Sequence, residues 1–186
     1  MRHIETEREP LESSEPGPGA RGAISEEERL QKALDLAYAY VNPRDRTVGE
    51  VRQRLQRRGV SEEPTETAIQ MLGQQGFLDD ARFARLFVAD KRALEEWGSE
   101  RIRRTLLSRG IDRHLADAAL AEAAAPQGDH GEPESELDRA LALLRRRFPD
   151  PPQDRGDRNR ALGMLMRKGY ESELALDALA AHSRGD

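Results

Sequence analysis

The feature that most constrains the fold is a segment that occurs three times, each copy centred on a glycine. The glycines are Gly59, Gly110 and Gly169, so successive copies lie 51 and 59 residues apart. A repeat of that length accommodates three helices, and the chain is therefore predicted to be a tandem array of helical units. Apolar residues recur four and eight residues before each glycine, one after it, and nine and ten after it: Leu55, Leu106 and Leu165; Val51, Ile102 and Ala161; Val60, Ile111 and Tyr170; Ala68-Ile69, Ala119-Leu120 and Ala178-Leu179.

The glycine in each copy indicates a particular way of ending a helix. A Schellman turn requires a positive φ just beyond the C-cap, and glycine adopts that conformation at the lowest cost. The turn also brings the residue after the glycine against the residue four before it, which predicts the contacts Leu55–Val60, Leu106–Ile111 and Leu165–Tyr170. A basic residue directly precedes each glycine and favours the negative end of the helix dipole: Arg58, Arg109 or Lys168.

A further helix is predicted before each pair, over about 26–41, 80–96 and 135–148. The first opens with the capping box Ser25-x-x-Glu28. The second begins at Asp79-Asp80, a pair that we interpret as a helix start, through capping and the dipole, rather than as catalytic carboxylates. This helix is expected to bury Phe83, Phe87 and Val88. Ser61 and Asp112 are placed to cap the helices that follow the first two glycine turns.

The predicted fold is all-α, with three tandem three-helix repeats and no confident strand. Repeat 1 covers 25–73, repeat 2 covers 74–121 and repeat 3 covers 137–181. Residues 1–24 combine Glu with Pro and Gly and offer little to bury, which predicts a disordered acidic tail. Residues 122–136 are predicted to be an acidic linker, and residues 182–186 a C-terminal tail.

Composition argues against an enzyme and against a membrane protein. Charged residues make up 35% of the chain and aromatic residues only 4%, which suits thin helical cores better than a thick α/β core. Cysteine is absent, and the sequence contains no phosphate-binding loop or nucleophile motif. We expect a cytoplasmic, monomeric, non-enzymatic protein without cofactor or metal. The four histidines are scattered and are interpreted as surface residues: His3, His114, His130 and His182.

The arginines are the candidate binding residues. The net charge is −5, but outside 1–28 and 122–138 the chain has 27 basic and 21 acidic residues. Arginines recur on the equivalent helix of successive units, so stacked units would align them into a basic strip suited to phosphates or an acidic protein. For any single helix, a solvated face with pairs such as Glu50–Arg54 is an equally good interpretation. The candidate partner-binding residues are Arg57, Arg58, Arg101, Arg103, Arg104 and Arg109.

Helix, turn, helix also describes a DNA-binding motif, and that alternative has to be weighed. The candidate recognition helix of the first unit would begin at Ser61-Glu62-Glu63, whose carboxylates repel phosphates. The equivalent segments beginning at Asp112 and Glu171 offer few of the side chains that read bases. A sequence-specific repressor is therefore disfavoured. Trp97 is interpreted as a packing residue at a unit junction.

The order and spacing of several motifs resemble those of the RecX family, over about 29–180 outside the acidic linker. Each motif is weak alone, and their succession makes the likeness specific. Ala161 and Gly163 make the third unit the weakest match. The motifs are Ala33-Leu34, Val51-x-x-x-Leu55-x-x-x-Gly59-Val60, Ala68-Ile69-x-x-Leu72-x-x-x-Gly76-Phe77-Leu78-Asp79-Asp80-Ala81-Arg82-Phe83-Ala84, Lys91-Arg92, Gly98-Ser99-x-Arg101-Ile102 and Gly110-Ile111.

The resemblance implies an elongated, curved molecule of three-helix repeats that regulates DNA repair and recombination. Its expected partner is the RecA filament on single-stranded DNA, bound in the filament groove, with weak direct DNA contact in addition. The expected effect is inhibition of the ATPase, recombinase and co-protease activities of RecA. Two alternatives remain open: a helix-turn-helix DNA-binding protein that acts without RecA, and a helical adaptor for another partner.

Overall fold

The computed structural model describes residues 25–125 and 135–184, and within these ranges the chain forms nine helices and no strand. The predicted tail 1–24 and most of the predicted linker lie outside the described residues. The helices are α1 (Glu26–Val41), α2 (Val48–Arg57), α3 (Glu62–Gln74), α4 (Asp80–Ala93), α5 (Ser99–Ser108), α6 (Arg113–Glu122), α7 (Glu136–Arg147), α8 (Arg155–Lys168) and α9 (Ser172–Arg184).

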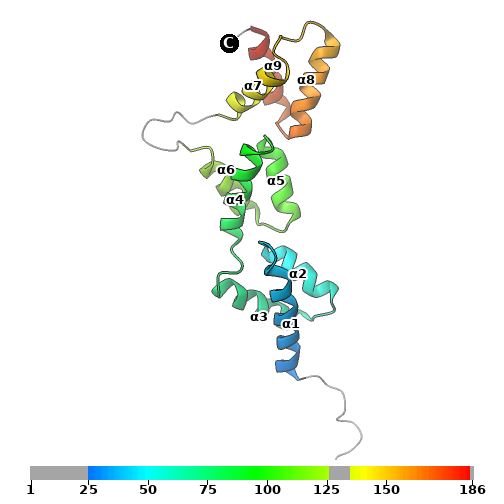
Figure 1. Ribbon diagram of the computed structural model, residues 1–186, viewed down its shortest axis with the longest axis vertical. Coiled ribbons are helices and arrows are strands. Elements are labelled where there is room, and N and C mark those ends of the chain that lie inside the picture. The colour runs from blue at the N-terminus through cyan, green and yellow to red at the C-terminus, as the bar shows by residue number, and fades with distance from the viewer. Residues whose placement is uncertain (1–24, 126–134, 185–186) are drawn as a thin grey trace, which may run out of the picture.

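The helices form three units of three, which follow one another along the long axis of the molecule (Figure 1). In each unit the first and third helices pack most extensively, and the second helix lies against the third. Each unit has its own hydrophobic core, and among residues 25–125 and 135–184 no apolar cluster is shared between two units. The prediction of an all-α fold built from three tandem three-helix repeats is confirmed.

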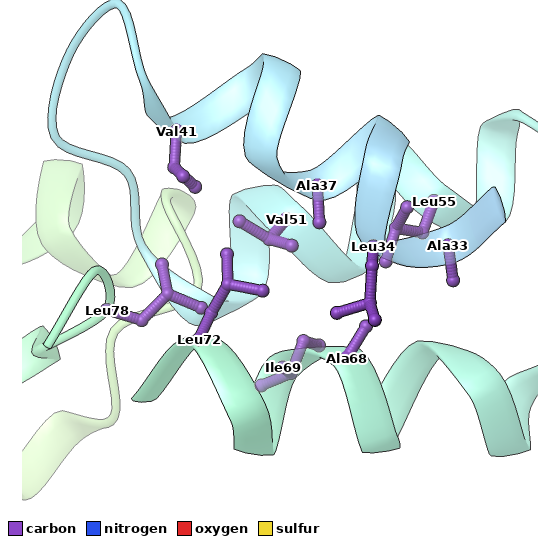
Figure 2. Packing of buried hydrophobic residues seen from close by; sticks show 10 residues of the cluster. All are labelled: Ala33, Leu34, Ala37, Val41, Val51, Leu55, Ala68, Ile69, Leu72 and Leu78. Carbon is purple, nitrogen blue, oxygen red and sulfur yellow. The ribbon is translucent and has the colours of Figure 1, made fainter. Parts of the chain in front are cut away.

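The core of the first unit shows how the repeated positions are used. Val51 and Leu55 of α2 are fully buried, and so is Ala68 of α3. Figure 2 shows Ala68 beside Leu34 of α1, where the small side chain lets the two helices approach closely. The equivalent Leu106 and Leu165 are also fully buried. Truncating such a leucine to alanine typically costs about 2–5 kcal/mol, so these positions dominate the stability of thin cores.

The three glycines end their helices as predicted. Gly59, Gly110 and Gly169 have φ values of 74°, 82° and 90°. In each turn the N–H of the residue after the glycine donates to the carbonyl of the leucine that lies four residues before the glycine, at 3.1 Å. Gly76 forms a fourth such turn at the end of α3, with φ 78°.

The helix starts confirm three of the four predicted caps. Ser25 forms the capping box with Glu28, Asp79 accepts from the Arg82 N–H at 2.8 Å, and Asp112 accepts from the His114 N–H at 2.7 Å. The prediction for Ser61 was wrong, since its side chain makes no capping bond. The third residue of α3 is Pro64, so one of the two N–H groups that could donate to the Ser61 hydroxyl is missing.

Several boundaries in the structure differ from the predicted ones. Leu78 is buried in the first core, so the first unit extends past residue 73. Helix α4 ends at Ala93 rather than near 96, and its Phe83 and Phe87 are only half-buried, unlike Val88. Helix α6 continues to Glu122, and α7 begins at Glu136, inside the predicted linker range.

The third unit extends further towards the C-terminus than was predicted. Helix α9 continues to Arg184, through residues that were predicted to be a tail. His182 is buried, and its Nε2 lies 2.8 Å from the carbonyl oxygen of Phe148. The interpretation of His182 as a surface residue was therefore wrong, because its ring packs under the end of α7. His114 is exposed, and His3 and His130 lie outside the described residues.

Candidate partner-binding surface

The first and second units meet where the start of α2 contacts the end of α5. Thr47 Oγ1 donates to the carbonyl oxygen of Arg109 at 2.5 Å, and Arg109 Nε donates to Glu50 Oε1 at 3.0 Å. The two backbones are in close contact, because a Cβ added at Gly49 would lie 2.7 Å from the Cα of Gly110. Helix α2 could not approach this turn so closely with any side chain at position 49.

The second and third units meet in the same manner, where the start of α5 contacts the end of α8. The Gly98 N–H donates to the carbonyl oxygen of Lys168 at 2.9 Å. A Cβ on Gly98 would overlap the carbonyl of Gly169. Lys168 Nζ donates to the carbonyl oxygen of Glu95 at 2.6 Å and lies 3.9 Å from the carboxylate of Glu96.

The two junctions place α8, α5 and α2 end to end, down one side of Figure 1. At each joint the partly negative end of one helix meets the partly positive start of the next. The contacts between helix ends thereby give hydrogen-bond partners to backbone groups that a helix end leaves without one. Arg109 and Lys168 hold equivalent repeat positions, as do Thr47 and Gly98. The basic residue before the glycine thus joins two units, in addition to its predicted effect on its own helix.

Asp80 contributes to the first junction from the start of α4. Its Oδ1 accepts a hydrogen bond from the Val48 N–H at 2.9 Å, so it caps α2 as well as lying in the first turn of α4. Burial raises the pKa of Asp80 above its ordinary value, and the bond from Val48 partly opposes that shift. Phe83 packs against the core of the second unit, and the Arg109 guanidinium lies 4.9 Å from its ring centre.

Three of the six candidate arginines have partners within the chain. Arg109 joins the first junction, as described above. Arg101 Nη1 donates to the carbonyl oxygen of Arg167 at 3.0 Å, and its guanidinium lies 3.9 Å from the ring centre of Trp97. Trp97 therefore packs at the second junction, in keeping with its interpretation. Arg103 pairs with Asp117 at 2.7 Å and also with Glu100. The bond from Arg103 lowers the pKa of the Asp117 carboxyl.

The other three candidates are Arg57, Arg58 and Arg104. All three are exposed, and none forms an ion pair or side-chain hydrogen bond with a residue that the structure describes. Arg57 and Arg58 lie at the free end of α2, while Arg104 lies on α5. The predicted strip is therefore divided, because among the six candidates only these three have no side-chain partner in the described part of the chain. Their role in binding stays a prediction.

Thr47 and Gly49 were given no role from the sequence, and Gly98 was named only within a motif that resembles the RecX family. Glu50 was considered as a partner of Arg54, whereas the structure pairs it with Arg109. Thr47 is fully buried although it is polar. One signal was available, since a glycine at a helix start lowers helix propensity and often marks a close backbone approach.

Among the described residues, no group of three or more histidine, aspartate or glutamate side chains is arranged to hold a metal ion. Over those same residues, no helix is both long and apolar enough to cross a membrane.

Comparison with protein families assigns each unit separately. The model described as the first three-helix domain of RecX matches residues 33–72, the second matches 79–120 and the third matches 134–179. The chain belongs to the RecX family. The three family domains coincide with the three units of the structure, and the third is matched despite Ala161 and Gly163.

Individual RecX proteins give the same result along most of the chain. The regulatory protein RecX of Amycolatopsis mediterranei is 31% identical over 160 residues, which covers 85% of this chain and 87% of that protein. The regulatory protein RecX of Xanthomonas campestris pv. campestris (strain B100) is 33% identical over 157 residues, covering 84% and 88%. These relatives are named as regulatory proteins.

Two crystal structures share the fold. RecX from Lactobacillus salivarius superimposes with a TM-score of 0.67 at 19% identity, covering 86% of this chain and 99% of that one. A second structure, described as regulatory protein RecX, gives a TM-score of 0.64 at 23% identity, covering 82% and 73%. At these identities the structural likeness establishes the RecX architecture alone.

Proposed function

We propose that this RecX-family protein binds in the groove of the RecA filament on single-stranded DNA and inhibits RecA ATPase, recombinase and co-protease activity. Membership of the RecX family over all three domains is the observation that carries the proposal. The relatives are named as regulatory proteins, which fits a protein that acts by binding. The proposal places the protein in the cytoplasm with the filament, as an elongated monomer.

The form of the molecule supports groove binding. Three units joined end to end present separate contact points along one molecule, and weak contacts that are linked in this way add through effective concentration. Arg57, Arg58 and Arg104 are exposed on two successive units. Guanidinium groups bind carboxylates and phosphates with two parallel hydrogen bonds, so these arginines suit both protein acids and the DNA backbone.

The first experiment measures ATP hydrolysis by RecA from the same organism on single-stranded DNA while this protein is titrated in. We expect dose-dependent inhibition at substoichiometric ratios, because a blocked filament affects many protomers. An unchanged hydrolysis rate, with filaments confirmed by electron microscopy, would contradict the proposal.

A second experiment tests the exposed arginines. The variant R57E/R58E/R104E should inhibit more weakly than the wild type while its helicity by circular dichroism is unchanged. The control R29E/K32E/R85E changes the same charge at exposed residues of α1 and α4. Arg101, Arg103 and Arg109 are left intact, because reversing them would break contacts within the chain. Equal loss in both variants would indicate general charge attraction only.

Direct DNA binding distinguishes the remaining alternatives. We expect weak binding to naked DNA without a preferred sequence. A steep salt dependence together with one preferred sequence would instead favour a DNA-binding protein that acts without RecA. Glu62 and Glu63 are exposed at the start of α3, and their carboxylates disfavour the reading of DNA bases by that helix.

A further inference from the structure

The turn between α4 and α5 contains a residue in a backbone conformation that it does not favour. Glu96 has φ 55° and is the only non-glycine residue with positive φ in the described part of the chain. It directly precedes Trp97, whose N–H donates to the carbonyl oxygen of Lys91 at 3.0 Å and closes the turn after α4. The glycines with positive φ hold the same place in their own turns. Since glycine would adopt this conformation at a lower cost, the side chain at position 96 needs another explanation.

The side chain of Glu96 contacts the third unit. Its carboxylate forms ion pairs with Arg146 near the end of α7 and with Lys168 at the end of α8, the second at 3.9 Å. Lys168 Nζ also donates to the carbonyl oxygen of the neighbouring Glu95 at 2.6 Å. One residue of the second unit thus contacts two helices of the third. The glutamate makes its own turn less stable but joins the two units, which a glycine could not do.

Other contacts between these two units lie close together at the start of α5. The Gly98 N–H donates to the end of α8, and the Ser99 N–H donates to Glu136 Oε1 at 2.6 Å. Arg101 also donates to the end of α8. The three donors all lie within residues 98–101, so they fix the position of the third unit at one place. The pairs of Glu96 add contacts away from that place, and they can therefore fix the direction of the third unit.

The ion pairs of the second junction are more open to salt than the pair of the first. The Glu50 and Arg109 side chains are only 18% and 26% exposed and lie 3.0 Å apart. Arg146 is 59% exposed, and Lys168, although sheltered, lies 3.9 Å from the carboxylate of Glu96. Salt screens exposed pairs strongly and sheltered pairs much less. Raised ionic strength should therefore weaken the second junction and leave the first intact.

We propose that Glu96 is an ionic latch, whose pairs with Arg146 and Lys168 fix the direction of the third unit on the second and are released by raised ionic strength. The contacts at the start of α5 then remain as a pivot. The first two units keep their arrangement, because their junction resists salt. The latch is a property of this chain alone and stands whether or not RecA is the partner.

The test measures distances across each junction with pairs of spin labels. The chain contains no cysteine, so introduced cysteines alone take the labels. Ala89→Cys on α4 and Ala180→Cys on α9 label exposed positions of the second and third units. Ala39→Cys on α1, combined with Ala89→Cys, spans the first junction as a control. Double electron–electron resonance gives the distance distribution at about 0.05 M and about 0.5 M salt, where screening lengths are roughly 14 Å and 4 Å.

Three substitutions separate the charge at position 96 from its backbone. Glu96→Gln removes the charge and keeps the unfavourable backbone, whereas Glu96→Gly removes both. Glu95→Gln is the matched control, since the Glu95 carboxylate pairs with Lys91 of its own unit at 3.7 Å. At low salt we expect both changes at position 96 to broaden the 89–180 distribution as far as high salt broadens that of the wild type. Further salt should then have no effect on them. Glu95→Gln should act as the wild type, and the 39–89 distribution should not change.

Melting temperatures check that the variants remain folded and that the backbone at position 96 is costly. Glu96→Gly should melt about 2–4 °C above Glu96→Gln, because glycine adopts positive φ without the steric cost that a side chain brings. Equal 89–180 distributions for the wild type and Glu96→Gly at low salt would overturn the latch. Equal broadening of both label pairs by salt would also overturn it, since the whole chain would then loosen rather than one junction.

Discussion

The hydroxyl of Thr47 donates a hydrogen bond to the carbonyl oxygen of Arg109 at 2.5 Å, across 62 residues of sequence. This bond joins the start of α2 to the end of α5, and the equivalent pair Gly98 and Lys168 joins α5 to α8. Within the part of the chain that the structure describes, no apolar cluster spans two units. The relative placement of the units therefore depends on polar contacts between helix ends and on glycines that let the ends approach.

Substituting alanine for glycine should have opposite effects at two helical positions. At Gly73 of α3 a Cβ would meet nothing within 4 Å, so Gly73→Ala should stabilise the protein by about 0.5–1 kcal/mol through helix propensity. At Gly49 of α2 a Cβ would lie 2.7 Å from the Gly110 Cα, so Gly49→Ala should destabilise by about 1–3 kcal/mol. Urea denaturation measures both free energies of unfolding. Equal stabilisation by the two variants would show that the junction is not tightly packed.

The Glu50–Arg109 pair should couple more strongly than a surface pair. Its side chains are 18% and 26% exposed, against 46% and 40% for the pair Glu66 and Arg52. Exposed pairs contribute about 0.2–1 kcal/mol and are screened by salt. A double-mutant cycle with Glu50→Gln and Arg109→Met should give a larger coupling energy that persists in 0.5 M salt (roughly a 4 Å screening length). A coupling energy no larger than that of Arg52–Glu66 would contradict the assigned role.

Asp80 should make stability depend on pH. Its pKa is raised in the folded protein, chiefly by burial. The folded chain then binds the proton more tightly than the unfolded chain, so ionisation of this group costs stability as the pH rises through the raised pKa. Asp80→Asn keeps an oxygen for the Val48 N–H but carries no charge. We expect this variant to exceed the wild type in stability at pH 7, with the difference shrinking towards about pH 4. A difference that grows as the pH falls would show the opposite sign of coupling.

Residues 182–184 should be necessary for the stability of the third unit. His182 is buried and its ring contacts the Phe148 carbonyl. A chain ending at Ala181 leaves that carbonyl without its partner and opens a hole under α7, which should cost about 2–4 kcal/mol. A chain ending at Arg184 should unfold like the full-length protein. The melting temperatures of the two truncated proteins measure the difference in stability, and identical values would show that residues 182–184 are a tail without a role in the fold.

Much of the fold could be predicted because it depends on local chemistry. The glycine turns follow from the positive φ that only glycine adopts readily, and Gly59, Gly110 and Gly169 all have it. The cap at Asp79 follows from a short side chain beside a helix start. The failure at Ser61 has a local contribution, since Pro64 removes one of the two N–H groups from which a cap can accept.

The candidate surface was predicted less completely, because a charge pattern does not show which charges are already paired. Arg101, Arg103 and Arg109 looked equivalent to Arg57, Arg58 and Arg104 in sequence. The structure divides the six according to whether a carbonyl or carboxylate from a distant segment lies within reach. His182 was missed for the same reason, as its partner is the carbonyl of Phe148 on another helix.

The sequence by itself determined the helices, their glycine turns and the three separate cores, because helix periodicity, capping and turn conformation act over fewer than about ten residues. Only the tertiary structure decided how the units join. Thr47 donates a hydrogen bond to Arg109, and Gly98 donates one to Lys168, so that helix ends far apart in the chain come into contact. Such contacts depend on where whole helices lie in space, and no local pattern encodes that position.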